Sequence, residues 1–459
     1  MRARAPRLMI AGTSSNVGKT TVTCGVMRAL TLRGMRVQAC KCGPDYIDPV
    51  FHKRVLGIPS RNLDLFLAGD KLVRRLVTEG ARKADLTLME GAMGYYDGIA
   101  QSADASAYEV ARITDTPVVL VVDAQGKALS CAAEVTGFVR FREPSLVAGV
   151  ILNRVSAGYF PMLRQMIERE AGVPVLGYLP RMDEVSLRSR HLGLVGADEV
   201  VDLQQRIDAL AQTLAKTVDV DALVRIAQSA PELEYEPWEE TVPCKDDPLI
   251  AIADDAAFTF CYADTLATLE RLGARLVRFS PLKDESLPRG INGLYLCGGY
   301  PELHARALSA NSSMRSSILG AVEAGLPTIA ECGGFLYLQE TLEDAEGAPW
   351  PMVGALSGHG YGTGRLGRFG YVTLAARTNS LLADEGETLR AHEFHYWDSD
   401  HCGNAFRAQK PQSSRGWDCV VATSSLYAGF PHLYLAGDLH AATRFVEACA
   451  RFGAARGEG

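Results

Sequence analysis

The chain has 459 residues, of which 47% are hydrophobic, and its formal net charge at pH 7 is −7. That length predicts two to three domains with substantial hydrophobic cores. The negative charge and the lack of a long basic block argue against nucleic acid or a membrane surface as a partner. No apolar run approaches the ~20 residues of a membrane span.

The cysteines and the N-terminal residues favour a cytoplasmic location. The eleven cysteines are odd in number and scattered, and Cys24, Cys40 and Cys131 lie within apolar runs, which is typical of reduced, buried thiols. Cys40 and Cys42 have no second ligand pair at metal spacing, so we expect them to pack in the core. The N-terminal residues lead directly into a strand, with no signal-peptide core or cleavage site.

A glycine- and serine-rich loop follows the first apolar strand, residues 7–11, and opens a helical pattern that ends at Gly34. This order predicts a phosphate-binding loop, because backbone N–H groups and a helix N-terminus attract anions. We expect Lys19 to reach the terminal phosphates and the Thr20 hydroxyl to face Mg²⁺. Thr13 stands where the usual spacing has a glycine, and an ordinary glycine-rich turn is the alternative. The expected nucleotide-binding residues are Gly12, Thr13, Asn16, Val17, Gly18, Lys19, Thr20 and Thr21.

Further short apolar runs alternate with helical patterns along the N-terminal half. Because these runs are nearly continuous and rich in β-branched residues, they predict a doubly wound parallel sheet with helices on both faces. In such sheets ligands bind at the carboxyl ends of the strands. The runs span residues 37–42, 86–90, 118–122, 149–153 and 175–179.

Carboxylates follow two of these strands. Asp45 and Asp48 lie in a proline-bracketed turn after the second strand, and Glu90 ends the third. Beside a phosphate loop, such groups serve Mg²⁺ or a phosphate-bearing substrate. The alternative for Asp45 and Asp48 is a turn held by its own backbone. Asp97 lies beyond a glycine bend and is a candidate for substrate contact, with a simple Asp-Gly turn as the alternative.

Three further signals follow, of which the first is weak. Asn153 ends its strand, where its amide can read an adenine edge or cap a helix. The basic loop with Arg190 and His191 suits an anionic substrate, although a solvated surface is the default interpretation. Residues 230–248 combine prolines with a run of glutamates and are predicted to be an interdomain linker, stiffened by proline and kept unfolded by charge.

A second strand–helix series begins at residues 249–253 and includes a cysteine at a sharp bend. Cys332 follows an apolar run and precedes two glycines. A strand-to-helix elbow would push its thiol outward at a helix N-terminus, which lowers the pKa of a thiol. The alternative is a buried structural thiol in a glycine turn. The expected oxyanion hole is formed by N–H groups of Gly298, Gly299 and Gly333.

A cysteine nucleophile needs a base, and three histidines are candidates: His392, His395 and His432. His392 and His395 also have the spacing of metal ligands, but only a third ligand would make a metal site credible. Spacing alone does not rank the three as bases.

Taken together, the motifs resemble the cobyrinic acid a,c-diamide synthase family along nearly the whole chain. One motif would be a moderate indicator, whereas eight in order are a strong one. The spacing around Thr13 is shared by this family and by the related dethiobiotin synthetases. The matching segments are residues 12–21, 43–49, 60–64, 90–98, 190–194, 298–302, 331–334 and 392–396.

The resemblance implies an α/β protein with two domains. Residues 1–229 would form a P-loop, dethiobiotin-synthetase-like ATP domain, residues 230–248 the linker, and residues 249–459 a flavodoxin-like class I glutamine amidotransferase domain. The implied reaction is ATP- and glutamine-dependent amidation of the a and c acetate carboxylates of cobyrinic acid through acyl phosphates. Ammonia would reach the acyl phosphate along a protected path.

Other functions remain open from the sequence. Hydrogenobyrinic acid and nickel sirohydrochlorin are alternative substrates for the same reaction. Cobyric acid synthase is a rival enzyme that the motifs at residues 45–49 and at Asp97 disfavour. A nucleotide-switch binding protein with an inactive amidotransferase domain is the rival of another class, which the Cys332 elbow disfavours. A partitioning-type ATPase would also carry a second lysine where Ser14 stands.

The resemblance also implies roles for single residues. Cys332 would be the glutaminase nucleophile and His432 its base, ahead of His392, His395 and His440. Related glutaminases often have a Glu two residues after that His, but Tyr434 stands there, so no third member is identified. The implied partners are ATP, glutamine and a corrinoid polycarboxylate, and a homodimer is a further expectation. The implied Mg²⁺ ligands are Thr20, Glu90 and Asp45 or Asp48, and the implied substrate contacts are Tyr46, Asp97, Arg190 and His191.

Overall fold

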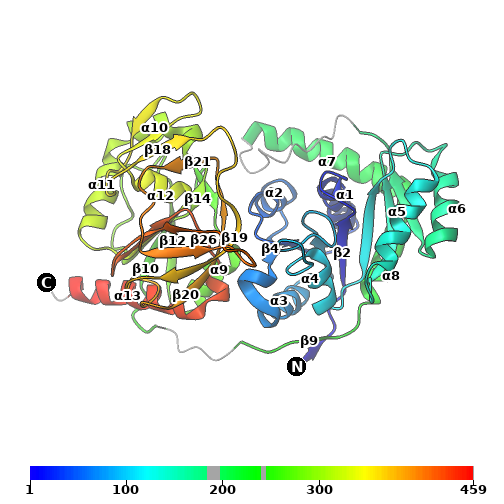
Figure 1. Cartoon of the computed structure of the whole chain (residues 1–459), viewed down its shortest axis with the longest axis horizontal. Helices are drawn as coiled ribbons and strands as arrows, with labels where there is room; N and C mark the ends of the chain where they lie inside the picture. The colour runs from blue at the N-terminus through cyan, green and yellow to red at the C-terminus, as the bar shows by residue number, and fades with distance from the viewer. Residues whose placement is uncertain (183–196, 239–243, 458–459) are drawn as a thin grey trace. The chain divides into compact units, whose positions relative to one another are not determined.

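The computed structural model describes residues 1–182, 197–238 and 244–457. The chain, drawn as a ribbon in Figure 1, divides into two compact units, Met1–Trp238 and Glu239–Gly459. Each unit has its own hydrophobic core. Arg190 and His191, the predicted substrate residues of the basic loop, lie outside the described residues. Within the described ranges, no helix combines the length and apolar character that crossing a membrane requires.

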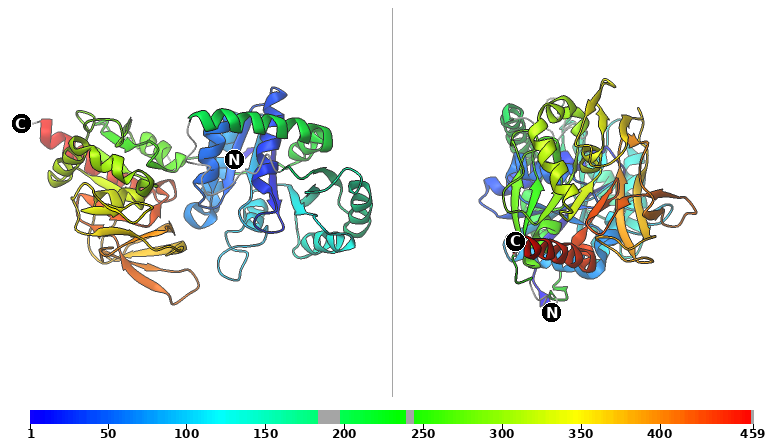
Figure 2. Two further views of the ribbon diagram at one scale, coloured as in Figure 1. Left: turned by 90° about the horizontal axis from the view of Figure 1, so that it is seen from above. Right: turned by 90° about the vertical axis from the view of Figure 1, so that its left-hand side faces the viewer.

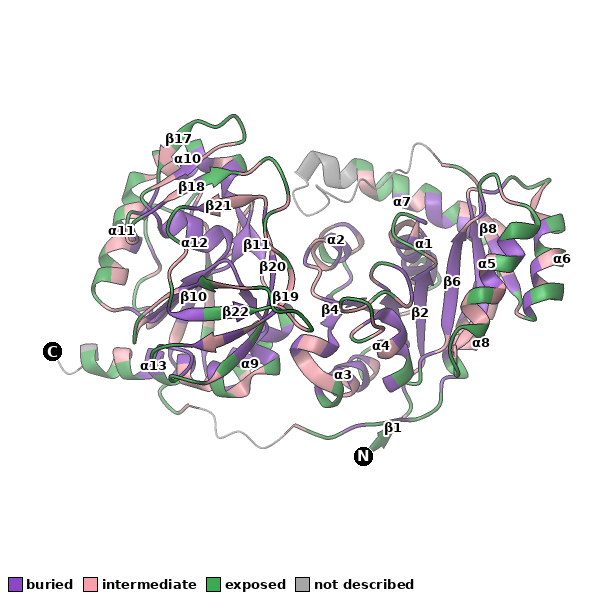
Figure 3. Ribbon diagram, in the orientation of Figure 1, coloured by how far each residue is buried: buried purple, intermediate pink, exposed green. Residues whose placement is uncertain are grey.

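A parallel sheet forms the centre of the first unit, with the strand order β4-β3-β5-β2-β6-β7-β8. The predicted doubly wound sheet is confirmed, and all six predicted strands are present. The prediction missed β4, a short edge strand with a polar sequence. The central strands are buried on both faces (Figure 3), which explains their nearly continuous apolar runs. The strands are β2 (Arg7–Gly12), β3 (Val37–Cys42), β4 (Ser60–Leu63), β5 (Leu86–Glu90), β6 (Val118–Asp123), β7 (Val147–Asn153) and β8 (Val175–Leu179).

Helices cover both faces of this sheet. Val26, Leu210 and Leu223, from α1, α7 and α8, share one buried cluster with Leu8 of β2. The left view of Figure 2 shows α7 on one side of the sheet, with α5 and α6 on the other. The helices are α1 (Lys19–Leu32), α2 (Ile47–Leu56), α3 (Leu65–Ala81), α4 (Ala107–Ile113), α5 (Leu129–Arg140), α6 (Phe160–Ala171), α7 (Ala197–Thr217) and α8 (Val220–Gln228).

The first unit extends into the predicted linker. β9 (Leu233–Glu234) pairs antiparallel with β1 (Arg2–Ala3), and Leu233 is fully buried. The Arg75 guanidinium lies 4.3 Å from the centre of the Trp238 ring and donates to the carbonyl of Glu236 at 2.7 Å. Residues 230–238 are therefore attached to the first unit, and residues 239–243 lie outside the described residues.

The second unit contains a mainly parallel sheet in the order β12-β10-β13-β15-β25-β24, with β24 antiparallel at the edge. The predicted strand at residues 249–253 is confirmed, and the apolar run before Cys332 also forms a strand of this sheet. Its strands are β10 (Leu249–Ala253), β12 (Arg275–Phe279), β13 (Gly293–Leu296), β15 (Thr328–Glu331), β24 (Val421–Ala422) and β25 (Leu426–Gly429). The helices used below are α9 (Ala263–Arg271), α11 (Ser312–Glu323), α12 (Gly333–Leu338) and α13 (Leu439–Gly457).

Two further sheets, which the sequence analysis did not predict, follow α12 in the chain. One has the order β17-β16-β18-β21 and the other the order β23-β22-β19-β20-β26. The second matters for function because it carries His392 and His432. The strands are β16 (Thr341–Glu343), β17 (Pro349–Pro351), β18 (His359–Gly362), β19 (Phe369–Ala376), β20 (Thr388–Phe394), β21 (Trp397–Ser399), β22 (Phe406–Gln409), β23 (Gly416–Cys419) and β26 (His432–Leu433).

Candidate active sites

The glycine-rich loop of the first unit connects β2 to α1 at the carboxyl end of the sheet. Asn16 and Gly18 have positive φ angles of 63° and 100°, which bends the chain tightly before the helix. The Lys19 ammonium donates to the carbonyl of Ser14 at 2.9 Å, so it is held over the loop. Burial, followed by the nearby ammonium of Lys41, lowers the pKa of Lys19 to about 8. An anion bound in the loop would reverse this effect.

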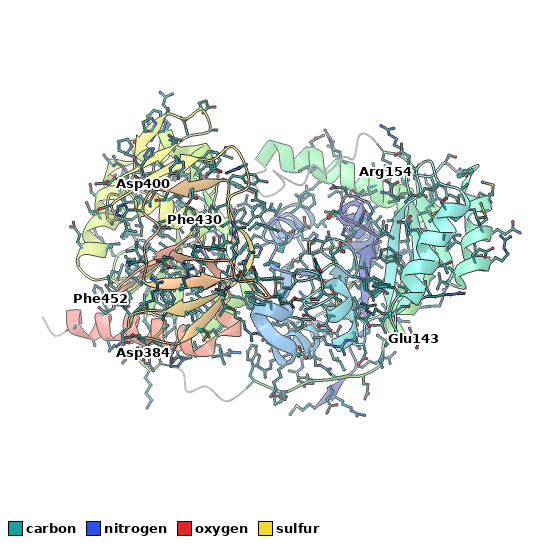
Figure 4. All side chains as sticks on the ribbon, in the orientation of Figure 1. Glu143, Arg154, Asp384, Asp400, Phe430 and Phe452 are labelled. Atoms are coloured by element: carbon teal, nitrogen blue, oxygen red, sulfur yellow. The ribbon has the colours of Figure 1, made fainter. Side chains whose placement is uncertain are left out.

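Two residues at the end of β7 brace the loop. The Asn153 amide donates to the carbonyl of Val17 at 2.8 Å, and Arg154, labelled in Figure 4, donates to the carbonyl of Asn16 at 3.1 Å. A Cβ on Gly18 would lie 2.1 Å from the Asn153 amide nitrogen, so only glycine fits there. Asn153 thus contacts the loop backbone, and its reading of an adenine edge stays a prediction.

Lys41 lies among the carboxylates that the sequence analysis predicted to bind Mg²⁺. Its Nζ is 2.5 Å from Oδ2 of Asp48, 2.9 Å from Oε1 of Glu90 and 3.9 Å from Oδ2 of Asp45. Burial alone would raise the pKa of Glu90, but Lys41 and then His52 hold that pKa well below its usual range. The sequence analysis gave Lys41 and His52 no role. The available signal was a lysine near the carboxyl end of a predicted strand of the parallel sheet.

Thr20, Glu90, Asp45 and Asp48 all carry oxygen donors, which are the ligands that Mg²⁺ prefers. The Thr20 hydroxyl donates to Oε1 of Glu90 at 2.7 Å, and this pair fits a hard cation. Asp45 accepts the N–H groups of Ile47 and Asp48 at 2.8 and 3.3 Å, as in the turn considered above. Over the described ranges, no three His, Cys, Asp or Glu side chains are grouped to hold a metal ion. Thr20 and Glu90 therefore fit Mg²⁺ best.

The described candidates for substrate contact lie on neighbouring loops. Tyr46 directly precedes α2 and is buried. Asn62 donates to the carbonyls of Gly43 and Asp45 at 2.9 and 2.7 Å and so fixes the loop that carries Tyr46. Asp97 is exposed, and one of its oxygens accepts the N–H of Gly94 at 2.9 Å. The turn at Asp97 is thus present, and it leaves the side chain at the surface.

The predicted elbow at Cys332 is present between β15 and α12. The φ of Cys332 is 48°, a strained value typical of a nucleophile elbow, and its N–H donates to the carbonyl of Gly429 at 2.8 Å. A Cβ on Gly333 would lie 3.0 Å from the amide nitrogen of Gly299. The glycines from both predicted halves of the oxyanion hole therefore lie together beside Cys332.

The expected low pKa of the Cys332 thiol was wrong. Burial raises its pKa, the nearby Glu302 raises it further, and the N–H of Gly333 lowers it by too little to compensate. The thiol belongs to a residue only 6% exposed, and α12 has only six residues. Desolvation therefore outweighs the helix terminus.

Among the candidate bases, the structure brings His432 to the elbow. A Cβ on Gly298 would lie 2.4 Å from Cε1 of His432, so the ring packs directly on the glycine turn. Nδ1 of His432 is 3.4 Å from Oε2 of Glu331, the residue that precedes Cys332. The sequence analysis did not predict this contact between Glu331 and His432.

The other histidines have different surroundings. His392 lies opposite His432 in the β20–β26 pairing, and burial, followed by the proximity of the His432 ring, lowers the pKa of His392 to about 3. His395 stacks on Phe430, labelled in Figure 4, with ring centroids 4.0 Å apart. His440 lies on α13 with a side chain 64% exposed. In the part of the chain that the structure describes, no third ligand makes His392 and His395 a metal site.

The fold and these two centres define a P-loop nucleotide-binding domain joined to a glutamine amidotransferase domain. Residues 8–195 match the family model of the CobQ/CobB/MinD/ParA nucleotide binding domain, and residues 249–438 match that of the CobB/CobQ-like glutamine amidotransferase domain. Full-length similarity extends this result, and the chain belongs to the cobyrinate a,c-diamide synthase family.

Three relatives carry that assignment. The chain is 38% identical to the cobyrinate a,c-diamide synthase of Caldanaerobacter subterraneus, over 97% of this chain and 98% of that protein. It is 43% identical to the synthase of Salmonella typhimurium, over 95% and 96%, and 43% identical to that of Listeria monocytogenes, over 85% and 86%. Among solved structures, the MinD cell division protein of Aquifex aeolicus matches with a TM-score of 0.32 and 16% identity, over 48% of this chain and 95% of that one. That likeness is too remote to bear on function.

Proposed function

We propose that this protein is a ligase that amidates the a and c acetate carboxylates of cobyrinic acid, using ATP and glutamine, in cobalamin biosynthesis. The observation that carries the proposal is the presence in one chain of a phosphate loop with Lys19 and a Cys332 elbow with His432 beside it. The names of the relatives supply the substrate.

The first unit activates the carboxylate. A carboxylate is a poor acyl donor, so phosphoryl transfer from ATP converts it to an acyl phosphate. The loop N–H groups and the Lys19 ammonium offset the charge of the transferring phosphoryl group. Mg²⁺, when bound by Thr20 and Glu90 with Asp45 or Asp48, supplies further charge neutralisation. We assign substrate contacts to Tyr46, Asp97, Arg190 and His191.

The second unit releases ammonia from glutamine. Because burial raises the pKa of Cys332, the thiol carries its proton at neutral pH and must transfer it during attack. His432 accepts this proton and returns it to the departing ammonia, which leaves a thioester that water hydrolyses. The N–H groups of Gly298, Gly299 and Gly333 stabilise the oxyanion. Ammonia then displaces phosphate from the acyl phosphate, and a second cycle amidates the other acetate.

Mass spectrometry of the products tests the proposal. The purified protein is incubated with ATP, Mg²⁺, glutamine and, separately, cobyrinic acid, hydrogenobyrinic acid or nickel sirohydrochlorin. We expect two carboxyl-to-amide conversions on cobyrinic acid. Diamidation of another ring in preference would reassign the substrate, and failure to consume ATP and glutamine with any ring would refute the reaction. The homodimer and the cytoplasmic location stay predictions.

A further inference from the structure

The side chain of Glu331 is held in one orientation beneath the glutaminase centre. Glu331 ends β15, directly before Cys332, and is 1% exposed. Its Oε1 accepts the hydroxyl of Tyr295 at 3.0 Å and the N–H of Leu433 at 3.1 Å. These two bonds fix the carboxylate, and its other oxygen lies 3.4 Å from Nδ1 of His432.

This chain lacks a glutamate that related glutaminases often have close to the histidine in sequence. They often carry a Glu two residues after the histidine, where this chain has Tyr434. The Tyr434 hydroxyl donates to Oδ2 of Asp264, on α9, at 3.0 Å, so its polar group is engaged elsewhere. The carboxylate that faces Nδ1 of His432 instead comes from β15, the strand that ends directly before Cys332.

We propose that Glu331 is the positioning residue for His432 in the glutaminase reaction. The Glu331 carboxylate keeps the proton of the neutral ring on Nδ1, so that the lone pair of Nε2 accepts the Cys332 proton. When the imidazolium forms, the same carboxylate faces its new positive charge. The 3.4 Å separation shortens at that moment, as such contacts do when the transition state forms. This proposal rests on the proposed glutaminase function.

The surroundings of His432 support Glu331 over its neighbours as the charged partner. His392 faces His432 from β20, but burial lowers the pKa of His392 to about 3, so it is neutral and adds no charge. Cys332, from the elbow, is the proton donor in the reaction. Gly298 packs against the His432 ring but has no side chain, so it contributes no charge. Glu331 is the group here that combines a fixed carboxylate with ion-pair distance to Nδ1.

The first test is a direct measurement on the intact wild-type protein. ¹⁵N NMR of histidine-labelled enzyme, with His432→Asn used to assign the signal, reports which ring nitrogen of His432 carries the proton. We expect the proton on Nδ1. A neutral His432 protonated on Nε2 would overturn the proposal, and this result does not depend on any Glu331 variant folding.

The second test is Glu331→Gln, which retains an acceptor for Tyr295 and Leu433 but replaces the carboxylate at His432. We expect kcat for glutamine hydrolysis to fall about 100-fold or more, with KM for glutamine and ammonia-dependent synthesis unchanged. Glu331→Asp should restore part of kcat. Glu343→Gln is the matched control, since Oε1 of Glu343 lies at the same 3.4 Å from His359, and we expect it to leave kcat unchanged.

The outcomes separate this inference from the proposed function. Full glutaminase activity in Glu331→Gln would overturn the positioning role while leaving the reaction intact. Equal losses of glutamine-dependent and ammonia-dependent synthesis would assign Glu331 a purely structural role and also overturn it. A wild-type protein with no glutaminase activity would instead refute the proposed function itself.

Discussion

The ammonium of Lys41 lies 2.5 Å from Oδ2 of Asp48, and the two residues are only 4% and 5% exposed. Because the same ammonium also contacts Glu90, its removal would leave two buried carboxylates without their cation. We expect Lys41→Met to lower the free energy of unfolding by about 3–5 kcal/mol, measured by urea denaturation. Arg36→Met, which removes an exposed pair with Asp85, is the control and should change little. Unchanged stability of Lys41→Met would contradict the buried cluster.

Removal of the proposed nucleophile, Cys332, should separate the two half-reactions. We expect Cys332→Ala to abolish glutamine-dependent synthesis and to leave ammonia-dependent synthesis intact, because ammonia bypasses the thioester. Cys449→Ala, which removes a buried thiol from α13, should retain both activities. Amide formation followed with each nitrogen donor is the measurement, and equal loss of both activities in Cys332→Ala would count against its assignment.

Loss of the loop lysine should stop synthesis with either nitrogen donor. Lys19 is the one positively charged side chain of the loop, residues 12–21. Removal of one group that stabilises the transferring phosphoryl group costs about 10²–10³ in kcat. Lys19→Ala should therefore lose both activities while glutamine hydrolysis in the second unit survives. Full ammonia-driven synthesis in this variant would refute the role of Lys19.

The lowered pKa of Lys19 has a consequence for nucleotide binding. With a pKa of about 8, the free lysine loses its proton as the pH rises through 8, whereas bound phosphates favour the ammonium form. ATP binding should therefore take up protons near pH 8.5 and weaken at higher pH. Titration calorimetry in buffers of different ionisation enthalpy measures this uptake. Lys19→Arg, which stays charged, should show none, and proton-neutral binding by the wild type would contradict the shifted pKa.

A methyl group at Gly298 should disable the proposed base, His432, and leave the ATP-dependent step unchanged. Its Cβ would lie 2.4 Å from Cε1 of His432, so Gly298→Ala should displace the ring and reduce glutamine hydrolysis by about 100-fold. Ammonia-dependent synthesis should persist. Gly320→Ala, on α11 with open space around its Cβ, is the control and should be neutral or slightly stabilising. Normal glutaminase rates in Gly298→Ala would place His432 elsewhere.

The sequence supported prediction where local pattern determines structure. The apolar runs located β2, β3, β5 and their neighbours because strands buried on both faces have few alternatives. The Cys332 elbow followed from a strand end and two glycines. The sheets after α12 were missed because their strands are short and mix polar with apolar residues. Neither the two-residue period of a strand nor the 3.6-residue period of a helix is clear in their sequences.

Contacts between residues far apart in the sequence could not be predicted from local sequence patterns. Glu331 and His432 are 101 positions apart, and their approach depends on pairing of β15 with β25. The ion pairs of Lys41 were not predicted for the same reason, since they depend on Asp48 and Glu90 lying close to it in the fold. The pKa of Cys332 was misjudged because burial, which sequence does not report, outweighs a short helix.

The pairing of β1 with β9 bears on how the first unit is isolated as a fragment. A fragment that stops at residue 229 leaves Arg2–Ala3 without its partner strand and Arg75 without its indole neighbour. One that stops at Trp238 retains both. The longer fragment should therefore resist proteolysis better, and the few residues gained would decide whether nucleotide binding can be measured apart from the rest of the enzyme.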